Sequence, residues 1–353
     1  MKFFFKYKYL LLIFLFVACS KQDTSSQTTP NPTPNPTPTP TPAPTFVFAK
    51  GADISWVTQM ESSGYKFYDS TGTQKDCFTL LKSLGMNSIR LRVWVNPSDG
   101  WCNTTDLVAK AVRAKNAGMR IMIDFHYSDV WADPGHQTIP VAWVGQNITT
   151  LETSVYNHTQ TVLNTLKANS ITPTWVQIGN ETNDGMLWET GRASTNMANF
   201  AGLINAGYNA VKAIDTTIKV IVHISNGFDN SLFRWVFDGL KTNNANWDII
   251  GMSLYPTTSN WALQNFQCLT NMNDMVSRYG KQVMICEVGM DVNSPTVCQS
   301  FLNDLFTKVK SVSNNNGLGI FYWEPESYNW QSYSLGAFDN TGKPTVALNA
   351  FAN

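Results

Sequence analysis

The sequence predicts a single α/β domain with the (β/α)8 architecture, the TIM barrel. Short apolar runs rich in β-branched residues recur eight times along the chain, and stretches with helical spacing separate them. After residue 45 there is no second linker, low-complexity stretch or charge block. Residues 46–353 are therefore expected to form one domain, long enough for eight β-then-α units.

The expected elements alternate in sequence. Strands are predicted over 51–55, 88–94, 120–126, 174–179, 219–224, 248–255, 282–287 and 319–323. Helices are predicted over 77–84, 107–117, 155–168, 199–213, 231–240, 272–279 and 298–312. A doubly wound open sheet is the rival fold. It is disfavoured because Gly51-Ala52-Asp53-Ile54-Ser55, at the first strand, contains no glycine-rich phosphate turn.

The first 45 residues have the pattern of an exported, tethered protein. Three lysines precede the apolar run Leu10–Ala18, which is too short for a membrane span of about 20 residues. Small residues and Cys19 end this run, as in a bacterial lipoprotein signal; plain secretion is the alternative. We expect a signal peptide over 1–18, lipidation of Cys19, and anchoring at a bacterial outer membrane or cell surface.

A proline-rich segment follows the predicted lipidation site. Residues 19–45 contain eight of the chain's sixteen prolines, and such a tract is typical of an extended linker. With Cys19 lipidated, an odd number of cysteines remains, so at least one thiol must be free. These are Cys77, Cys102, Cys268, Cys286 and Cys298.

Charge and composition narrow the class of partner. The 25 basic and 25 acidic residues cancel, so nucleic acid is not an expected partner. Twelve Trp and twelve Tyr offer many flat apolar faces, although core packing accounts for most of them. We expect a monomer that binds a carbohydrate.

Polar residues collect at the carboxyl ends of the predicted strands, where barrel enzymes place their active sites. They are Asp53, Arg90, Arg92, His126, Asp129, Asn180, Glu181, His223, Tyr255, Glu287, Trp323 and Glu324. Glu181 closes the fourth strand and Glu287 the seventh, so they face each other across the barrel mouth. Two carboxylates about 5–5.5 Å apart suit glycoside hydrolysis with retention of configuration.

Four ordered motifs resemble the family 53 glycoside hydrolases, the endo-β-1,4-galactanases. They are Ile89–Pro97, Asp124–Pro134, Gln177–Glu181 and Tyr322–Pro325. The resemblance runs from about Gly51 to Ala350, and it implies endo-hydrolysis of β-1,4-galactosidic bonds in the type I (arabino)galactan side chains of pectin. It also implies a retaining double displacement.

The resemblance also implies roles for individual residues. Glu181 would be the acid/base and Glu287 the nucleophile, with Arg90 and Tyr255 as partners of Glu287. Asn180 would bind the sugar 2-hydroxyl, and Trp323 would face one sugar ring. Asp53, His126 and His223 would line the sugar site.

No cofactor is expected, and no metal is expected for catalysis. Some bacterial relatives hold calcium in a long acidic loop after the seventh strand, but residues 289–295 are short and offer few oxygen ligands. Two other functions stay open at this point. One is a related barrel glycosidase that acts on mannan or cellulose, and the other is a non-catalytic glycan-binding protein at the cell surface.

Overall fold

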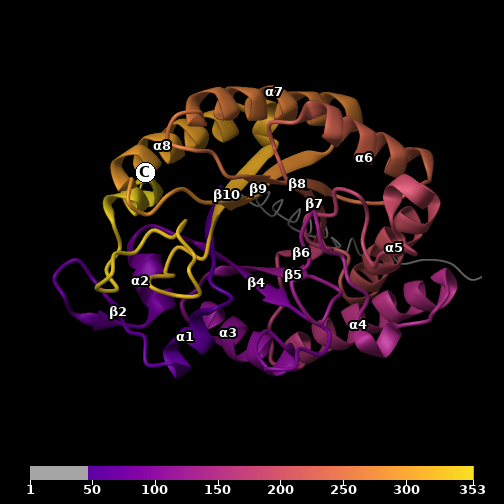
Figure 1. Cartoon of the computed structure of the whole chain (residues 1–353), viewed down its shortest axis with the longest axis horizontal. Coiled ribbons are helices and arrows are strands. Elements are labelled where there is room, and N and C mark those ends of the chain that lie inside the picture. The colour runs from indigo at the N-terminus through magenta and orange to yellow at the C-terminus, as the bar shows by residue number, and fades with distance from the viewer. Residues whose placement is uncertain (1–46, 353) are drawn as a thin grey trace, which may run out of the picture. The chain divides into compact units, whose positions relative to one another are not determined.

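The computed structural model describes residues 47–352, which form an eight-stranded barrel inside a ring of helices (Figure 1). The predicted signal peptide, Cys19 and the linker lie outside the described residues. All eight barrel strands are parallel, and β1 pairs with β10 to close the sheet. The strands in barrel order are β1 (Ala49–Asp53), β4 (Ser88–Val93), β5 (Arg120–Phe125), β6 (Trp175–Ile178), β7 (Lys219–Ile224), β8 (Ile249–Leu254), β9 (Gln282–Val288) and β10 (Gly317–Trp323).

Helices follow the strands and cover the outside of the barrel. They are α1 (Val57–Ser62), α2 (Cys77–Ser83), α3 (Thr104–Asn116), α4 (Ile148–Ala168), α5 (Ala193–Ile214), α6 (Asn230–Thr242), α7 (Trp261–Tyr279) and α8 (Pro295–Ser311). Side-chain oxygens of Asp76, Asn103, Asn147 and Asp229 accept the backbone N–H of the third residue of α2, α3, α4 and α6. No helix within 47–352 is both long and apolar enough to cross a bilayer.

Short elements complete the described chain. A two-stranded hairpin of β2 (Phe67–Tyr68) and β3 (Gln74–Lys75) lies between α1 and α2 and was not predicted. Three 3-10 helices are η1 (Val141–Trp143), η2 (Ser313–Asn315) and η3 (Val346–Ala352). η3 packs against α8, where the Phe351 and Phe306 rings lie 5.1 Å apart. The last segment therefore packs onto the helical layer at α8.

The predicted fold class is confirmed, and each predicted strand corresponds to a barrel strand within about two residues at either end. The predicted helices α4, α5 and α7 begin too late, by seven residues for α4 at Ile148 and eleven for α7 at Trp261. The first turns of α4 and α5 are rich in Thr, Ser and Asn, and in α7 the early apolar residues Leu263 and Phe266 are exposed, so the buried apolar pattern starts only further along. α7 ends at Gly280, whose φ of 64° is the left-handed conformation that glycine adopts at helix ends.

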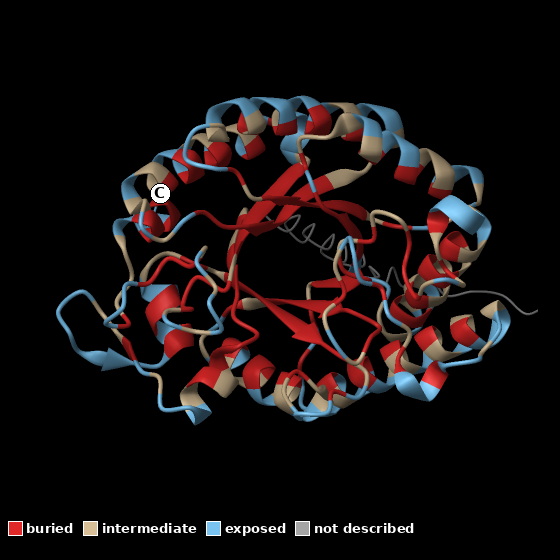
Figure 2. Ribbon diagram, viewed as in Figure 1, coloured by how far each residue is buried: buried red, intermediate tan, exposed pale blue. Residues whose placement is uncertain are grey.

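The barrel interior changes from apolar to polar along the strands. Residues two apart on a strand share a face, so Met122 and Asp124 both point inward, as do Trp175 and Gln177. The apolar residues form a plug near the amino ends of the strands: Ala49, Met122, Trp175, Ile221, Ile249, Met284, Cys286, Leu318 and Phe321. Figure 2 shows the barrel strands buried almost throughout. The polar residues stand above this plug and form the floor of the site.

All five cysteines within 47–352 are buried and free, in agreement with the prediction of at least one unpaired thiol. Burial raises the pKa of Cys268 and of Cys286 to about 12, so both stay protonated at neutral pH.

Candidate active site

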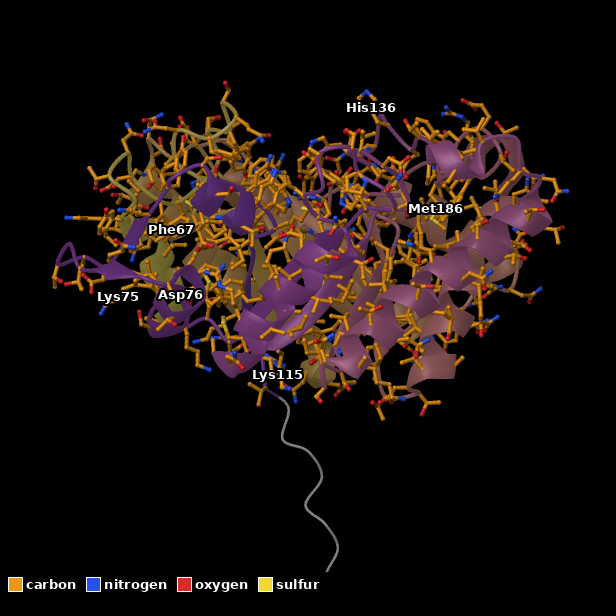
Figure 3. All side chains as sticks on the ribbon, turned by 90° about the horizontal axis from the view of Figure 1, so that it is seen from below. Phe67, Lys75, Asp76, Lys115, His136 and Met186 are labelled. Carbon is orange, nitrogen blue, oxygen red and sulfur yellow. The ribbon has the colours of Figure 1, made fainter. Side chains whose placement is uncertain are left out.

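A cleft of about 530 Å³ opens at the carboxyl ends of the barrel strands. Figure 3 shows the barrel from the side, with His136 at the cleft end and Lys115 at the opposite end. The cleft is lined by Trp56, His126, Trp131, Ala132, Asp133, Asn180, Glu181, Tyr255, Glu287, Trp323, Gln331, Ser332, Tyr333 and Leu335. Both glutamates that the sequence singled out therefore lie on one surface.

Glu287 reaches the cleft because β9 is irregular at this point. Opposite β8, Met252 pairs with Ile285 but Ser253 pairs with Glu287, so one extra residue is inserted on β9. A register shift also occurs toward β10 between the Ile285 and Val288 pairs. A bulge of this kind re-aims the side chain beside it. Because of the bulge, two consecutive residues both point into the barrel. Cys286 faces the apolar plug, and Glu287 faces the cleft.

Two donors hold the Glu287 carboxylate. Arg90 Nη1 lies 2.8 Å from Glu287 Oε1, and the Tyr255 hydroxyl donates to Oε2 at 2.8 Å. These contacts are the ones expected from sequence for Arg90 and Tyr255. A cation and a hydroxyl donor both favour the ionised carboxylate, which is the form that can attack an electrophile.

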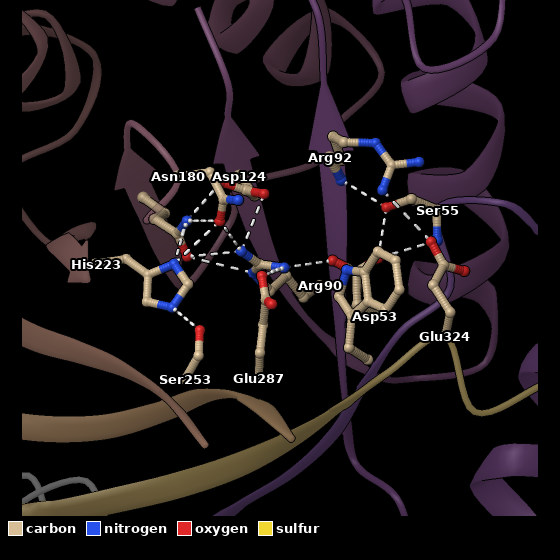
Figure 4. A network of polar contacts seen from close by, with 12 residues as sticks. Asp53, Ser55, Arg90, Arg92, Asp124, Asn180, His223, Ser253, Glu287 and Glu324 are labelled. Carbon is tan, nitrogen blue, oxygen red and sulfur yellow. Dashed lines mark hydrogen bonds and ion pairs between the residues drawn. The ribbon is translucent and has the colours of Figure 1, made fainter. Parts of the chain in front are cut away.

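Arg90 is fully buried at the centre of a polar network (Figure 4). Besides Glu287, it pairs with Asp53 at 2.6 Å and with Asp124 at 3.0 Å. It also donates to Gln177 Oε1 and, at 2.9 Å, to Asn180 Oδ1. Burial alone would favour neutral groups, but Arg90 and His126 outweigh it and lower the pKa of Asp124. The network is thus charged and fixes the Glu287 side of the cleft.

Glu181 has fewer partners and follows a sharp turn at the end of β6. Gly179 and Glu181 have φ of 78° and 43°, so the chain leaves the strand abruptly. The Asn180 amide donates to Ala132 O at 2.8 Å, and Gln137 donates to Asn180 O at the same distance. This turn brings Glu181 over the cleft while Asn180 stays bonded to Arg90.

The two glutamates titrate as a pair. Burial raises the pKa of Glu181 to about 7 and that of Glu287 to about 8, and the value for Glu287 includes repulsion from an ionised Glu181. With Glu181 protonated, that repulsion is absent, while Arg90 and Tyr255 still favour the Glu287 anion. We therefore assign the shared proton to Glu181. One acid and one carboxylate then face the same cleft at neutral pH.

Both histidines near the cleft are neutral. His126 lines it; its Nδ1 accepts the Ala132 N–H at 3.1 Å, so its Nε2 carries the hydrogen that Asp124 accepts at 2.9 Å. Burial lowers the pKa of His126. Burial, followed by Arg90, lowers the pKa of His223 well below its usual value. Neither side chain adds a positive charge to the site.

Aromatic rings build the other wall of the cleft. Trp56 contacts Trp323, Trp131 and Tyr333 edge-on, with ring centroids 5.0, 5.7 and 5.7 Å away. Arg92 lies beneath them, its guanidinium 4.1 Å from the Trp131 ring. These rings offer apolar faces to the C–H side of a sugar.

The structure differs from two expectations about the sugar site. Asp53 and His223 are fully buried and do not line the cleft; they contact its residues from behind. Arg90 is buried in the same way. Trp94 does not line the cleft either and packs behind Trp131, with the ring centroids 5.3 Å apart. His126, Asn180, Tyr255 and Trp323 do line the cleft, and their roles toward a sugar stay predictions.

Several residues of the site were not found from sequence. Asp124 and Gln177 stand inside predicted strands, where a polar residue is an unusual signal that was available. Trp56 follows the first strand closely and could have been found as a strand-end residue. Gln331, Ser332 and Tyr333 come from the loop after β10, which carried no periodic signal.

No group of three or more His, Cys, Asp or Glu side chains within 47–352 is arranged to hold a metal ion. The expectation that catalysis needs no metal stays a prediction.

Comparisons with known proteins point to one family. The model of "Glycosyl hydrolase family 53" matches residues 49–351. A probable arabinogalactan endo-β-1,4-galactanase A of Neosartorya fischeri is 37% identical over 313 residues, which cover 82% of this chain and 86% of the relative.

Solved structures agree with the sequence comparison. A fungal β-1,4-galactanase structure superposes with a TM-score of 0.81 at 31% identity, covering 86% of this chain and 99% of the other. The family 53 catalytic domain of Ignisphaera aggregans superposes with a TM-score of 0.77 at 29% identity, covering 86% and 95%. Fold and sequence thus match over almost all of the described residues.

Proposed function

Since the chain belongs to glycosyl hydrolase family 53, a retaining family, we propose that Glu181 and Glu287 perform the double displacement by which it cuts β-1,4-galactan internally. The observation that carries these roles is the unequal support of the two carboxylates in one cleft. Glu287 is held by Arg90 and Tyr255, whereas Glu181 has the proton to give. Mannan and cellulose are not favoured as substrates, because the relatives are galactanases.

In the first step, a Glu287 oxygen forms a bond to the anomeric carbon of the sugar. The bond from that carbon to the leaving oxygen breaks, and the Glu181 proton passes to this oxygen. In the second step, Glu181 takes a proton from water, the water oxygen bonds to the anomeric carbon, and Glu287 is released as a carboxylate. Asn180, fixed by Arg90 and Ala132, is placed to donate to a sugar hydroxyl.

The substrate is tested by measuring released reducing ends on β-1,4-galactan, β-mannan and a soluble cellulose derivative, with Glu287→Ala as the blank. We expect galactan turnover at least about 100-fold above that on the other two substrates. A buried polar group that hydrogen-bonds one substrate hydroxyl is left without a partner by a substrate that lacks this hydroxyl, and such a substrate is strongly disfavoured. Comparable kcat/KM on galactan and cellulose oligosaccharides of equal length would refute the galactan assignment.

The acid/base role is tested on an aryl galactoside with a good leaving group. Glu181→Ala should lose far more activity on galactan than in the bond-cleavage step of the aryl substrate, which needs little protonation. Azide should restore the second step, because the anion attacks without a base. Equal losses on both substrates without an azide effect would remove this role from Glu181.

We also propose that the enzyme is a lipid-anchored monomer whose anchor is Cys19, and that it acts on pectic galactan outside the cell. Support comes from the leader pattern and from the proline-rich linker, both in the part of the chain outside 47–352. Cys19→Ala should move the protein from the membrane fraction to the soluble fraction or block its processing. Unchanged partitioning would refute the anchor and leave the enzyme assignment intact.

A further inference from the structure

Ser253 lies opposite Glu287 in the sheet and beside His223, without lining the cleft. It is buried on β8, and it is the register partner of Glu287 at the bulge that turns Glu287 inward. Its hydroxyl oxygen is 2.8 Å from His223 Nε2. Figure 4 shows this contact at the edge of the Arg90 network.

The chain around Glu181 is tied to the strand that carries His223. The backbone N–H of Thr182 donates to His223 O at 2.9 Å, and the Thr182 hydroxyl donates to the same oxygen at 3.1 Å. Glu181 is therefore fixed next to β7, where His223 contacts the Ser253 hydroxyl of β8, and this hydroxyl lowers the pKa of Glu181 against the larger effect of burial.

The direction of the His223 contact follows from the other partners. Gln177 Oε1 accepts from Arg90, so the Gln177 nitrogen is the group 3.0 Å from His223 Nδ1. Asn180 Oδ1 is equally close to Nδ1 and accepts from Arg90 at 2.9 Å. A hydrogen on Nδ1 would face the Gln177 amide nitrogen, which can only donate, at 3.0 Å, so Nδ1 is an acceptor. Neutral His223 then carries its hydrogen on Nε2 and donates it to Ser253.

We propose that Ser253 is a positioning residue for the acid/base: its hydroxyl accepts a hydrogen bond from His223 and donates one to Glu181 when that carboxylate is ionised. This inference rests on the proposed role of Glu181. A hydroxyl that donates to a carboxylate makes a stronger bond than one that donates to a neutral imidazole. Ser253 thus supports Glu181 after it has given its proton to the leaving oxygen, and it holds the carboxylate for the water step.

Other charges also act on Glu181, and the test has to separate Ser253 from them. Arg90 favours the Glu181 anion, whereas Asp124 and Asp133 disfavour it. Glu287 repels it from across the cleft, and Tyr255 and His223 are neutral. Replacing Ser253 by Ala removes a hydrogen-bond partner of neutral His223 but adds or removes no charge among these groups, so a shift in the titration of Glu181 reports on the hydroxyl.

The experiment is the pH dependence of kcat/KM on β-1,4-galactan. The alkaline limb reports the group that must be protonated in the free enzyme. In Ser253→Ala, loss of a donor to the anion raises the pKa of Glu181, so this limb should move up by about one pH unit. Ser253→Thr, which keeps the hydroxyl, should bring the limb back toward the wild-type position.

Two controls make the outcomes distinguishable. Ser88→Ala also removes a buried strand hydroxyl, one that bonds only Asn87 at the far end of the barrel, and should leave the pH profile unchanged. In Glu181→Ala with the aryl galactoside, the alkaline limb should disappear; its persistence would overturn the acid/base assignment and this inference together. If the limb belongs to Glu181 but does not move in Ser253→Ala, only the role of Ser253 is overturned.

Discussion

Arg90 and Arg92 stand two residues apart on the same face of β4, yet they build two different halves of the cleft. Arg90 pairs with the carboxylates of Asp53, Asp124 and Glu287 within 3.0 Å. Arg92 has one carboxylate at 3.5 Å and lies instead beneath tryptophan rings. An arginine therefore holds carboxylates in one half of the cleft, and a second arginine supports an apolar surface in the other half.

The difference arises from what each side chain reaches. Arg90 contacts acids on β1, β5 and β9. Arg92, whose register partner on β5 is Asp124, instead reaches Trp56 and Trp131 on the loops. A barrel can thus carry its catalytic side chains and their polar partners on the strands, and the side chains that contact the substrate on the loops that follow.

Removing Arg90 should have the largest effect. Arg90→Ala leaves three buried carboxylates without their cation, and we expect a loss of about 3–5 kcal/mol in the free energy of unfolding. In the protein that still folds, kcat should fall by about 10²–10³-fold, because Glu287 loses a charged donor. Urea unfolding and initial rates on galactan measure the two effects. Wild-type kcat in this variant would show that Arg90 does not serve the nucleophile.

Arg92→Met should separate the two halves. Methionine keeps apolar contact with the rings but removes the cation–π interactions, each worth about 1–2 kcal/mol when desolvated. We expect KM on galactan to rise about tenfold while kcat changes by less than about threefold. Saturation kinetics on galactan of defined length measure this split. A fall in kcat as large as that of Arg90→Ala would erase the distinction between the two arginines.

The buried acids Glu324 and Glu326 predict a smaller effect, a dependence of the free energy of unfolding on pH. Glu326 is fully buried, and within the described chain neither of its carboxyl oxygens has a hydrogen-bond partner. Burial, followed by repulsion from the Glu324 carboxylate, raises the pKa of Glu326 well above its usual value. Glu326 is therefore a neutral acid beside Glu324, which accepts the Trp56 N–H at 3.1 Å.

A raised pKa means that the folded protein holds a proton which the unfolded chain loses above about pH 4.3. This contribution to stability is complete below that pH and declines as the pH rises toward the folded value. Glu326→Gln keeps a donor but cannot ionise, so it should match wild type near pH 5 and exceed it by about 1 kcal/mol near pH 9. Urea unfolding at both pH values measures the difference. Parallel stability curves would show that Glu326 is not buried as a neutral acid.

The same contrast explains what the sequence could predict. Strands are apolar and β-branched, so the barrel was predicted correctly, and Glu181 and Glu287 lie at the cleft as expected. The bulge that turns Glu287 inward was not predicted, because a bulge leaves no periodic signal. Asn180 and Tyr255 follow the same strand-end rule. The aromatic half depends on loops, whose paths are decided by tertiary contacts such as that between Tyr333 and Trp323 at 4.8 Å.

The central claim is that Glu287, ionised by Arg90, forms the covalent intermediate. It is tested most directly with a 2-deoxy-2-fluoro-β-galactoside that carries a good leaving group, because the fluorine slows both steps and the leaving group restores the first. Peptide mass spectrometry of the inactivated enzyme should find one glycosyl unit on Glu287 and none in Glu287→Ala. A label on another residue, or turnover with inverted configuration and no label, would contradict the account.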